Sequence, residues 1–381
     1  MIKQRLFTPG PTPVPERVML RMAQPMIHHR SPEFNEITTR VNENLRYLFQ
    51  TRQPVLTLTC SGTGGVEATI VSLFSPGDTI IAVNGGKFGE RWVKIPKTFG
   101  MKPVEIKVQW GKAPSEREIL DALKSHPEAK AVYLTHSETS TGAATDVKNL
   151  ARIIRDNSEA LVCVDGITAV GAHELRFDEW GIDACVTGSQ KGLMIPPGLA
   201  FVALSKRAIA LMESAKNPRF YFDLKKALAA HEKNDTPWTP AASLILGVDT
   251  ALQMIREEGI EHVWKRHERM AHAVRAGVRA LGMKLFADEP SFAVTPVWVP
   301  DGVEWKRFNG ILKNSYGVTV AGGQDEFAGK IFRISHLGYY DEIDMISILA
   351  ALERTLADCG VAFGHGNGVA AAQQYFLTNH D

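Results

Sequence analysis

Cysteine is scarce in this chain of 381 residues, which contains only Cys60, Cys163, Cys185 and Cys359. No two of them form a C-x-x-C pair, so no redox or zinc motif of that type is present. Cys163 and Cys185 lie inside apolar runs, where cysteine acts as a small hydrophobic residue. The cysteine pattern therefore favours a reducing compartment.

An excess of charge and long apolar runs are also lacking. The formal net charge is only +1, which gives no electrostatic case for binding nucleic acid or an acidic membrane surface. No apolar stretch approaches the roughly 20 residues that cross a bilayer, and the first residues lack the apolar segment of a signal peptide. We expect a cytoplasmic protein.

Histidine spacing gives no metal site. His28 and His29 are adjacent, whereas His262, His267 and His272 recur every five residues and so point in different directions around a helix. We expect no bound metal.

Predicted strands and helices alternate along most of the chain. Apolar runs predict strands at 55–59, 79–83, 131–135, 160–164, 184–187 and 200–204, and helical periodicity predicts helices at 32–49, 66–73 and 147–156. Such alternation is typical of an α/β protein with a mostly parallel sheet.

The pattern changes in the last third of the chain. Long helices at about 240–258 and 260–281 precede strands at 292–299 and 331–335, which predicts a smaller α+β C-terminal domain. We therefore expect an N-terminal arm (1–20), a large domain (21–258), a small domain (259–363) and a tail (364–381). The tail could either fray or pack as a short helix.

Asp165 and Lys191 each follow an apolar strand and enter a loop. Loops at the carboxyl ends of strands are where α/β folds bind ligands. An ordinary lysine is solvated and an acid after a strand often caps a helix, so neither residue alone is informative. Together, an acid that can hold a protonated pyridine nitrogen and an amine that can form an imine are what pyridoxal phosphate requires.

A glycine-rich turn, Cys60-Ser61-Gly62-Thr63-Gly64-Gly65, lies between a predicted strand and a predicted helix. Free N–H groups and the helix dipole favour an anion there. The turn is neither a Walker loop nor a dinucleotide motif. The glycines could equally serve only to make a tight turn.

Several further short motifs occur in one order along the chain. They are Thr8-Pro9-Gly10-Pro11, His29-Arg30-Ser31, Asn84-Gly85-Gly86-Lys87-Phe88-Gly89-Glu90-Arg91, Thr135-His136-Ser137-Glu138-Thr139-Ser140-Thr141-Gly142, Val164-Asp165-Gly166-Ile167, Gly188-Ser189-Gln190-Lys191, Thr236-Pro237-Trp238-Thr239-Pro240 and Phe332-Arg333-Ile334-Ser335-His336-Leu337-Gly338. With the glycine turn, they resemble the class V aminotransferases of the pyridoxal-phosphate-dependent transferase fold type I, in particular the alanine–glyoxylate and serine–pyruvate group.

The resemblance implies a role for each matching residue. Lys191 would form the aldimine with pyridoxal phosphate and then move the substrate proton, and Asp165 would keep the pyridine nitrogen protonated. Arg333 would bind the substrate α-carboxylate. The remaining cofactor contacts implied are Phe88 and Ile167 on the two ring faces, Ser140 near the phenolic oxygen, and Thr63, Gly64, Gly65 and Gln190 on the phosphate, with Thr236 and Thr239 from the second subunit of a homodimer.

The implied reaction is a ping-pong transamination from alanine or serine to glyoxylate or pyruvate. A desulfurase would need a cysteine nucleophile late in the chain, where only Cys359 occurs, in an expected helix. A lyase, a transaminase of a less common amine and a non-catalytic interaction subunit stay open. Arg30 and Arg91 could lie near the substrate side chain.

Overall fold

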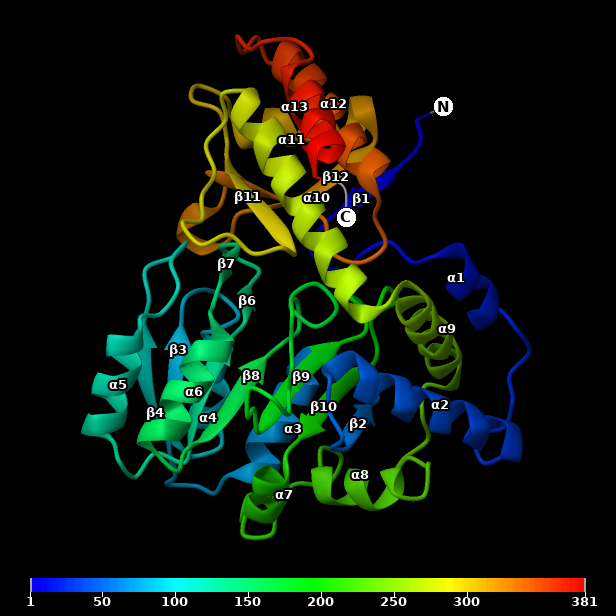
Figure 1. Cartoon of the computed structure of the whole chain (residues 1–381), viewed down its shortest axis with the longest axis vertical. Helices are drawn as coiled ribbons and strands as arrows, with labels where there is room; N and C mark the ends of the chain where they lie inside the picture. The colour runs from blue at the N-terminus through cyan, green and yellow to red at the C-terminus, as the bar shows by residue number, and fades with distance from the viewer. Residues whose placement is uncertain (1, 380–381) are drawn as a thin grey trace.

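The computed structural model describes residues 2–379, and its strands form two main sheets (Figure 1). The large sheet has seven strands in the order β2-β10-β9-β8-β5-β3-β4. Their bounds are β2 Val55–Leu58, β3 Thr79–Asn84, β4 Lys102–Lys107, β5 Ala131–Thr135, β8 Leu161–Asp165, β9 Ala184–Gly188 and β10 Ala200–Leu204. Only β10 runs antiparallel to its neighbours, so the sheet is mostly parallel, as predicted.

Helices cover both faces of this sheet because its strands are apolar on both sides. Ile81 and Val83 of β3 point into one core, whereas Ile80 and Ala82 point into the other. The first core is covered by α2 Pro32–Phe49, α5 Glu116–Ser125, α6 Val147–Asn157 and α9 Ala242–Glu258. The second is covered by α3 Gly62–Leu73, α4 Arg91–Thr98, α7 Lys206–Met212 and α8 Leu224–His231.

The second sheet lies beside the large one and has the order β1-β12-β13-β11. Its strands are β1 Arg5–Phe7, β11 Val294–Trp298, β12 Val318–Gly322 and β13 Ile331–Ser335. The helices that pack with it are α10 Ile260–Ala280, α11 Trp305–Tyr316, α12 Glu342–Asp358 and α13 Asn367–Thr378 (Figure 1). β1 comes from the predicted N-terminal arm, so the start of the chain belongs to this sheet.

α10 joins the two parts of the molecule. Its first residues, Ile260 and Val263, are buried in the core of the large sheet, and Met270 and Val274 are buried in the core of the small one. The C-terminal tail, for which two outcomes were open, packs as α13 against α10 and α12 and buries Phe376. The remaining elements are short: α1 Glu16–Met22, β6 Ser137–Glu138, β7 Ala143–Ala144 and a single 3-10 turn at Asp325–Phe327.

The predicted helix at 66–73 begins four residues earlier than expected. α3 starts at Gly62, so the glycine-rich turn forms its first turn instead of preceding it. The edge strand β4 was missed, because Lys102, Glu105 and Lys107 leave it with little apolar pattern. Within residues 2–379, no helix is long and apolar enough to cross a membrane.

Candidate active site

The two proposed catalytic residues, Asp165 and Lys191, lie at or just after the ends of neighbouring parallel strands. Asp165 is the last residue of β8 and pairs in register with Val186 of β9, and Lys191 follows the end of β9 by three residues. Both side chains therefore emerge at the same edge of the large sheet, the edge at which parallel sheets bind ligands.

Lys191 is buried, with 8% of its surface exposed. Its Nζ donates a hydrogen bond to the carbonyl oxygen of Pro9, at 2.5 Å. Burial, together with the positive charge of Arg333, lowers the pKa of Lys191 to about 8, although Asp165 opposes this shift. A larger neutral fraction near pH 7 makes this amine a better nucleophile than a solvated lysine.

The N-terminal segment lies directly against this lysine. Thr12 N donates to Gln190 O, at 3.2 Å, and Thr12 Oγ1 donates to Lys191 O, at 3.1 Å. Gly10 has a φ of +145°, and a Cβ there would stand 2.5 Å from Lys191 Cε. Only glycine fits between the segment and the lysine.

Gly10→Ala should therefore displace the lysine side chain. We expect turnover to fall by about 100-fold, the usual effect of misplacing a reacting group by about 1 Å. The matched control is Gly310→Ala in α11, where nothing lies within 4 Å of an added Cβ, and there we expect unchanged turnover and a gain of about 0.5–1 kcal/mol in unfolding free energy. Steady-state kinetics and thermal melts check both, and wild-type turnover in Gly10→Ala would contradict the contact.

Asp165 is buried, and Ile167 N donates a hydrogen bond to its Oδ1, at 3.0 Å. Burial raises the pKa of Asp165 to about 6, an effect that the Ile167 hydrogen bond opposes and the nearby Glu138 carboxylate reinforces. A cation beside Asp165 would lower the pKa of this carboxyl again and favour its charged form. The site therefore suits a protonated nitrogen.

The first turn of α3 lies against Ile167, whose N–H binds this carboxylate. A Cβ on Gly62 would stand 2.7 Å from Ile167 Cδ1, so glycine allows the helix to begin beside the loop that follows Asp165. The N–H groups of Gly64 and Gly65 donate to Ser61 O, whereas those of Gly62 and Thr63 donate no hydrogen bond within residues 2–379. Two free donors at a helix N-terminus suit an anion.

Gly65 faces the sheet instead of the free end of the helix. An added Cβ would stand 2.8 Å from Val186 Cγ1 and 3.1 Å from Ala200 Cβ. Its role visible here is the close approach of α3 to β9 and β10.

Gln190 has a polar atom that the fold leaves without a partner. Its Oε1 is buried without a hydrogen bond among the described residues, close to Gly188. Because the oxygen and nitrogen of a glutamine amide exchange by a flip, this position can also present a donor. An acceptor-rich group such as a phosphate would satisfy it, so the residues fit pyridoxal phosphate.

Phe88 and Ser140 are tied together by Glu138, a residue to which the sequence reasoning gave no role. The buried Glu138 carboxylate accepts hydrogen bonds from Ser140 Oγ, at 2.5 Å, from Gly89 N, at 2.8 Å, and from Phe88 N, at 3.2 Å. The only sequence signal was its place within the Thr135–Gly142 motif.

Arg333 lies in the middle of β13 and is buried. Nε donates to Gly322 O and Nη1 donates to Thr139 O, both at 3.0 Å. Burial lowers the pKa of Arg333 to about 10. No carboxylate pairs with it within the described part of the chain, so its charge is available to a substrate anion.

Thr236 and Thr239 are not joined to α3 by a hydrogen bond within this chain. Thr236 Oγ1 donates to Trp238 O, at 2.7 Å, and the residue lines a small cavity with Thr57, Thr59 and Tyr221. Thr239 is exposed.

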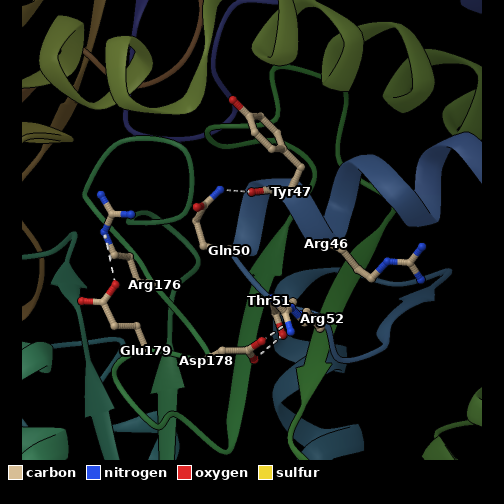
Figure 2. A pocket seen from close by; sticks show the side chains of 8 residues that line it. All are labelled: Arg46, Tyr47, Gln50, Thr51, Arg52, Arg176, Asp178 and Glu179. Atoms are coloured by element: carbon tan, nitrogen blue, oxygen red, sulfur yellow. Dashed lines mark hydrogen bonds and ion pairs between the residues drawn. The ribbon is translucent and has the colours of Figure 1, made fainter.

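An open hollow of about 530 Å³ lies at the C-terminal end of α2 (Figure 2). Two of its charged side chains, Asp178 and Arg176, already have partners within the fold. Asp178 accepts hydrogen bonds from Thr51 Oγ1 and from Arg52 N, and Arg176 pairs with Glu174 and Glu261. The hollow contains none of the predicted site residues.

A buried acid at the end of one parallel strand and a buried lysine in the loop after the next strand, beside a helix N-terminus with free donors, define a pyridoxal-phosphate enzyme of the transferase fold type I. A family model described as aminotransferase class V matches residues 5–346, most of the chain. The chain therefore belongs to the class V aminotransferases, which use pyridoxal phosphate, and it is an aminotransferase that acts on an amino acid and a 2-oxo acid.

Three relatives match over nearly their whole length. A protein of Anabaena cylindrica named soluble hydrogenase 42 kDa subunit is 42% identical, with 98% of this chain and 99% of that protein covered. The L-aspartate–glyoxylate aminotransferase of Paracoccus denitrificans is 38% identical (97% and 96% covered). The serine–glyoxylate aminotransferase of Hyphomicrobium methylovorum is 36% identical (99% and 96% covered).

Solved structures confirm the predicted fold class. The crystal structure of ureidoglycine–glyoxylate aminotransferase from Bacillus subtilis superposes with a TM-score of 0.94 at 29% identity, covering 99% of each chain.

Proposed function

We propose that this aminotransferase moves the amino group of a small amino acid, alanine or serine first, to a small 2-oxo acid, glyoxylate or pyruvate, in a ping-pong cycle. The observation that carries the proposal is the buried Lys191 amine beside Asp165. Three similar proteins share glyoxylate in their names but differ in the donor, which is aspartate, serine or ureidoglycine. Glyoxylate is therefore the best-supported acceptor.

Each catalytic residue has a separate task in this proposal. Bound pyridoxal phosphate supplies an electron sink for the bond that breaks at the substrate Cα. Lys191 would hold the cofactor and, when free, would carry the proton to and from the substrate Cα. Asp165 would keep the proton on the pyridine nitrogen.

The remaining residues would hold the cofactor in place. Phe88 and Ile167 would contact its ring, and Ser140 would lie near its phenolic oxygen. For the phosphate we propose the N-terminal turn of α3, with Thr63, Gly64 and Gly65, together with Gln190. The free N–H groups of Gly62 and Thr63 and the unpaired amide oxygen of Gln190 support this proposal. Gly65 would contribute only its backbone N–H, since an added Cβ would meet Val186 of the sheet.

Arg333 would bind the α-carboxylate of every substrate. Arg333→Ala should raise the apparent KM for each amino acid and 2-oxo acid by roughly 100-fold, because a buried charge-assisted contact is lost. The apparent KM of Arg333→Lys should lie between those of the wild type and Arg333→Ala, because lysine keeps the charge but lacks the planar pair of donors. Steady-state kinetics check this, and an unchanged KM in Arg333→Ala would place the carboxylate elsewhere.

A panel of donors tests the substrate proposal. Purified protein loaded with pyridoxal phosphate is incubated with glyoxylate and L-alanine, L-serine or L-aspartate, and glycine and the new 2-oxo acid are measured. We expect kcat/KM to be highest with alanine or serine. Highest efficiency with aspartate would overturn the donor assignment, and no glycine from any donor would overturn the acceptor assignment.

A second candidate function is a non-catalytic subunit of a larger assembly. The 42% identity to a protein named as a hydrogenase subunit favours it. Against it, a subunit without catalysis has no need of a buried lysine with a lowered pKa, a buried acid and a buried unpaired arginine. Turnover with any amino donor in the panel would exclude the non-catalytic subunit and support the enzyme.

We also propose a homodimer in the cytoplasm. Exposed apolar side chains lie on α1 (Met19 and Leu20), in the segment after it (Met26) and in the segment before α8 (Phe220). A partner that covers them would also bring the exposed Thr239 and its neighbour Thr236 to a second site. Light scattering should give twice the mass of one chain, and a single-chain mass would contradict the dimer.

For the organisation of the chain we propose an arm (1–20), a large domain (21–258), a small domain (259–363) and a tail (364–381). The separate apolar cores support this division. α10 spans two of these cores, and Phe7 lies in the core of the small sheet.

A further inference from the structure

Arg91 begins α4 and reaches two of the residues proposed to hold the cofactor. Its guanidinium carbon stands 4.8 Å from the centre of the Phe88 ring, and its Nη1 donates to Thr63 Oγ1, at 2.7 Å. Its neighbour Glu90 pairs with Lys87 and Lys94 instead. Within residues 2–379, Arg91 has no carboxylate partner.

We propose that Arg91 is a positioning residue for the cofactor, which fixes the ring of Phe88 with one face of its guanidinium and the hydroxyl of Thr63 with one nitrogen. This inference rests on the proposed roles of Phe88 and Thr63. A planar cation can stack on an aromatic face and donate within its own plane at the same time, which a lysine ammonium cannot do. Arg91 thus links the ring-stacking residue to the phosphate end of the site.

The charge of Arg91 reaches the reacting groups as well. Its positive charge lowers the pKa of Lys191 and that of Asp165. The geometric and the electrostatic effects are separable, because Arg91→Lys keeps the charge and loses the planar contact, whereas Arg91→Met loses both.

The experiment measures the dissociation constant of pyridoxal phosphate by absorbance titration, the circular dichroism of the bound cofactor and the pH dependence of its absorbance. We expect Arg91→Met and Arg91→Lys to weaken binding by about tenfold, as the loss of a stacked, hydrogen-bonded cation predicts. Only Arg91→Met should change the pKa obtained from the pH dependence of the cofactor absorbance. It should raise that pKa, because the positive charge is lost. Arg117→Met, in an exposed ion pair with Asp121 on α5, is the matched control and should change nothing.

A double-mutant cycle with Phe88→Leu separates this inference from the roles on which it rests. If Arg91 acts through Phe88, the variant with both substitutions should bind pyridoxal phosphate almost as tightly as the single variant that has the lower affinity. Independent, multiplying effects, or wild-type affinity in both Arg91 variants, would overturn the inference and leave the role of Phe88 standing. An unchanged affinity in Phe88→Leu itself would overturn both. Melting of the cofactor-free proteins identifies a variant that fails to fold, and Arg91→Lys then carries the test.

Discussion

Lys191→Ala should abolish turnover, with kcat lower by at least about 10⁴-fold, because the variant loses both the covalent attachment and the group that moves the substrate proton. The yellow absorbance of the lysine-bound cofactor should disappear as well. The structure supports so large an effect, because the Lys191 amine is buried at the centre of the site and hydrogen-bonded to Pro9 O.

A surface lysine provides the control for this prediction. Lys124, at the exposed end of α5, should tolerate the same change with turnover and absorbance unaltered. Added pyridoxal phosphate should still bind to the Lys191→Ala protein without covalent attachment. Wild-type turnover in Lys191→Ala would remove the residue from catalysis.

Asp165→Asn should give the second-largest loss. The amide keeps the shape of the carboxylate but cannot pair with a protonated pyridine nitrogen. We expect kcat/KM to fall by roughly 10²- to 10³-fold, which corresponds to the loss of one partner of a buried ion pair, about 3–4 kcal/mol.

The pH dependence of cofactor affinity tests the same residue. Burial raises the pKa of Asp165 to about 6 in the cofactor-free protein, so between its ordinary pKa and about 6 the folded protein holds this carboxyl protonated. The affinity advantage of wild type over Asp165→Asn should therefore be full above pH 7 and shrink as the pH falls through 6. A constant difference between pH 5 and pH 8 would show that the charge of Asp165 does not act on the cofactor.

Local patterns in the sequence were enough to predict the fold class. Strands buried on both faces give continuous apolar runs, so β5, β8, β9 and β10 were found within a residue of their bounds. The edge strand β4 carries few apolar residues, and the three-residue arm strand β1 depends on pairing with β12, far along the chain.

The site was only partly predictable for the same physical reason. Asp165 and Lys191 stand out because each follows a recognisable strand. The contact between Pro9 and Lys191 spans 182 residues, and the hydrogen bonds from Phe88 and Gly89 to Glu138 span about 50. Such partners are fixed by tertiary packing, and no local pattern marks them.

The most direct test of the central claim is an absorbance spectrum of the purified, cofactor-loaded protein, taken before and after addition of L-alanine or L-serine and then of glyoxylate. We predict a yellow band that fades with the amino donor and returns with the 2-oxo acid, the two halves of a transamination in one cuvette. A protein that stays colourless after incubation with pyridoxal phosphate, or a band that no donor changes, would contradict the account.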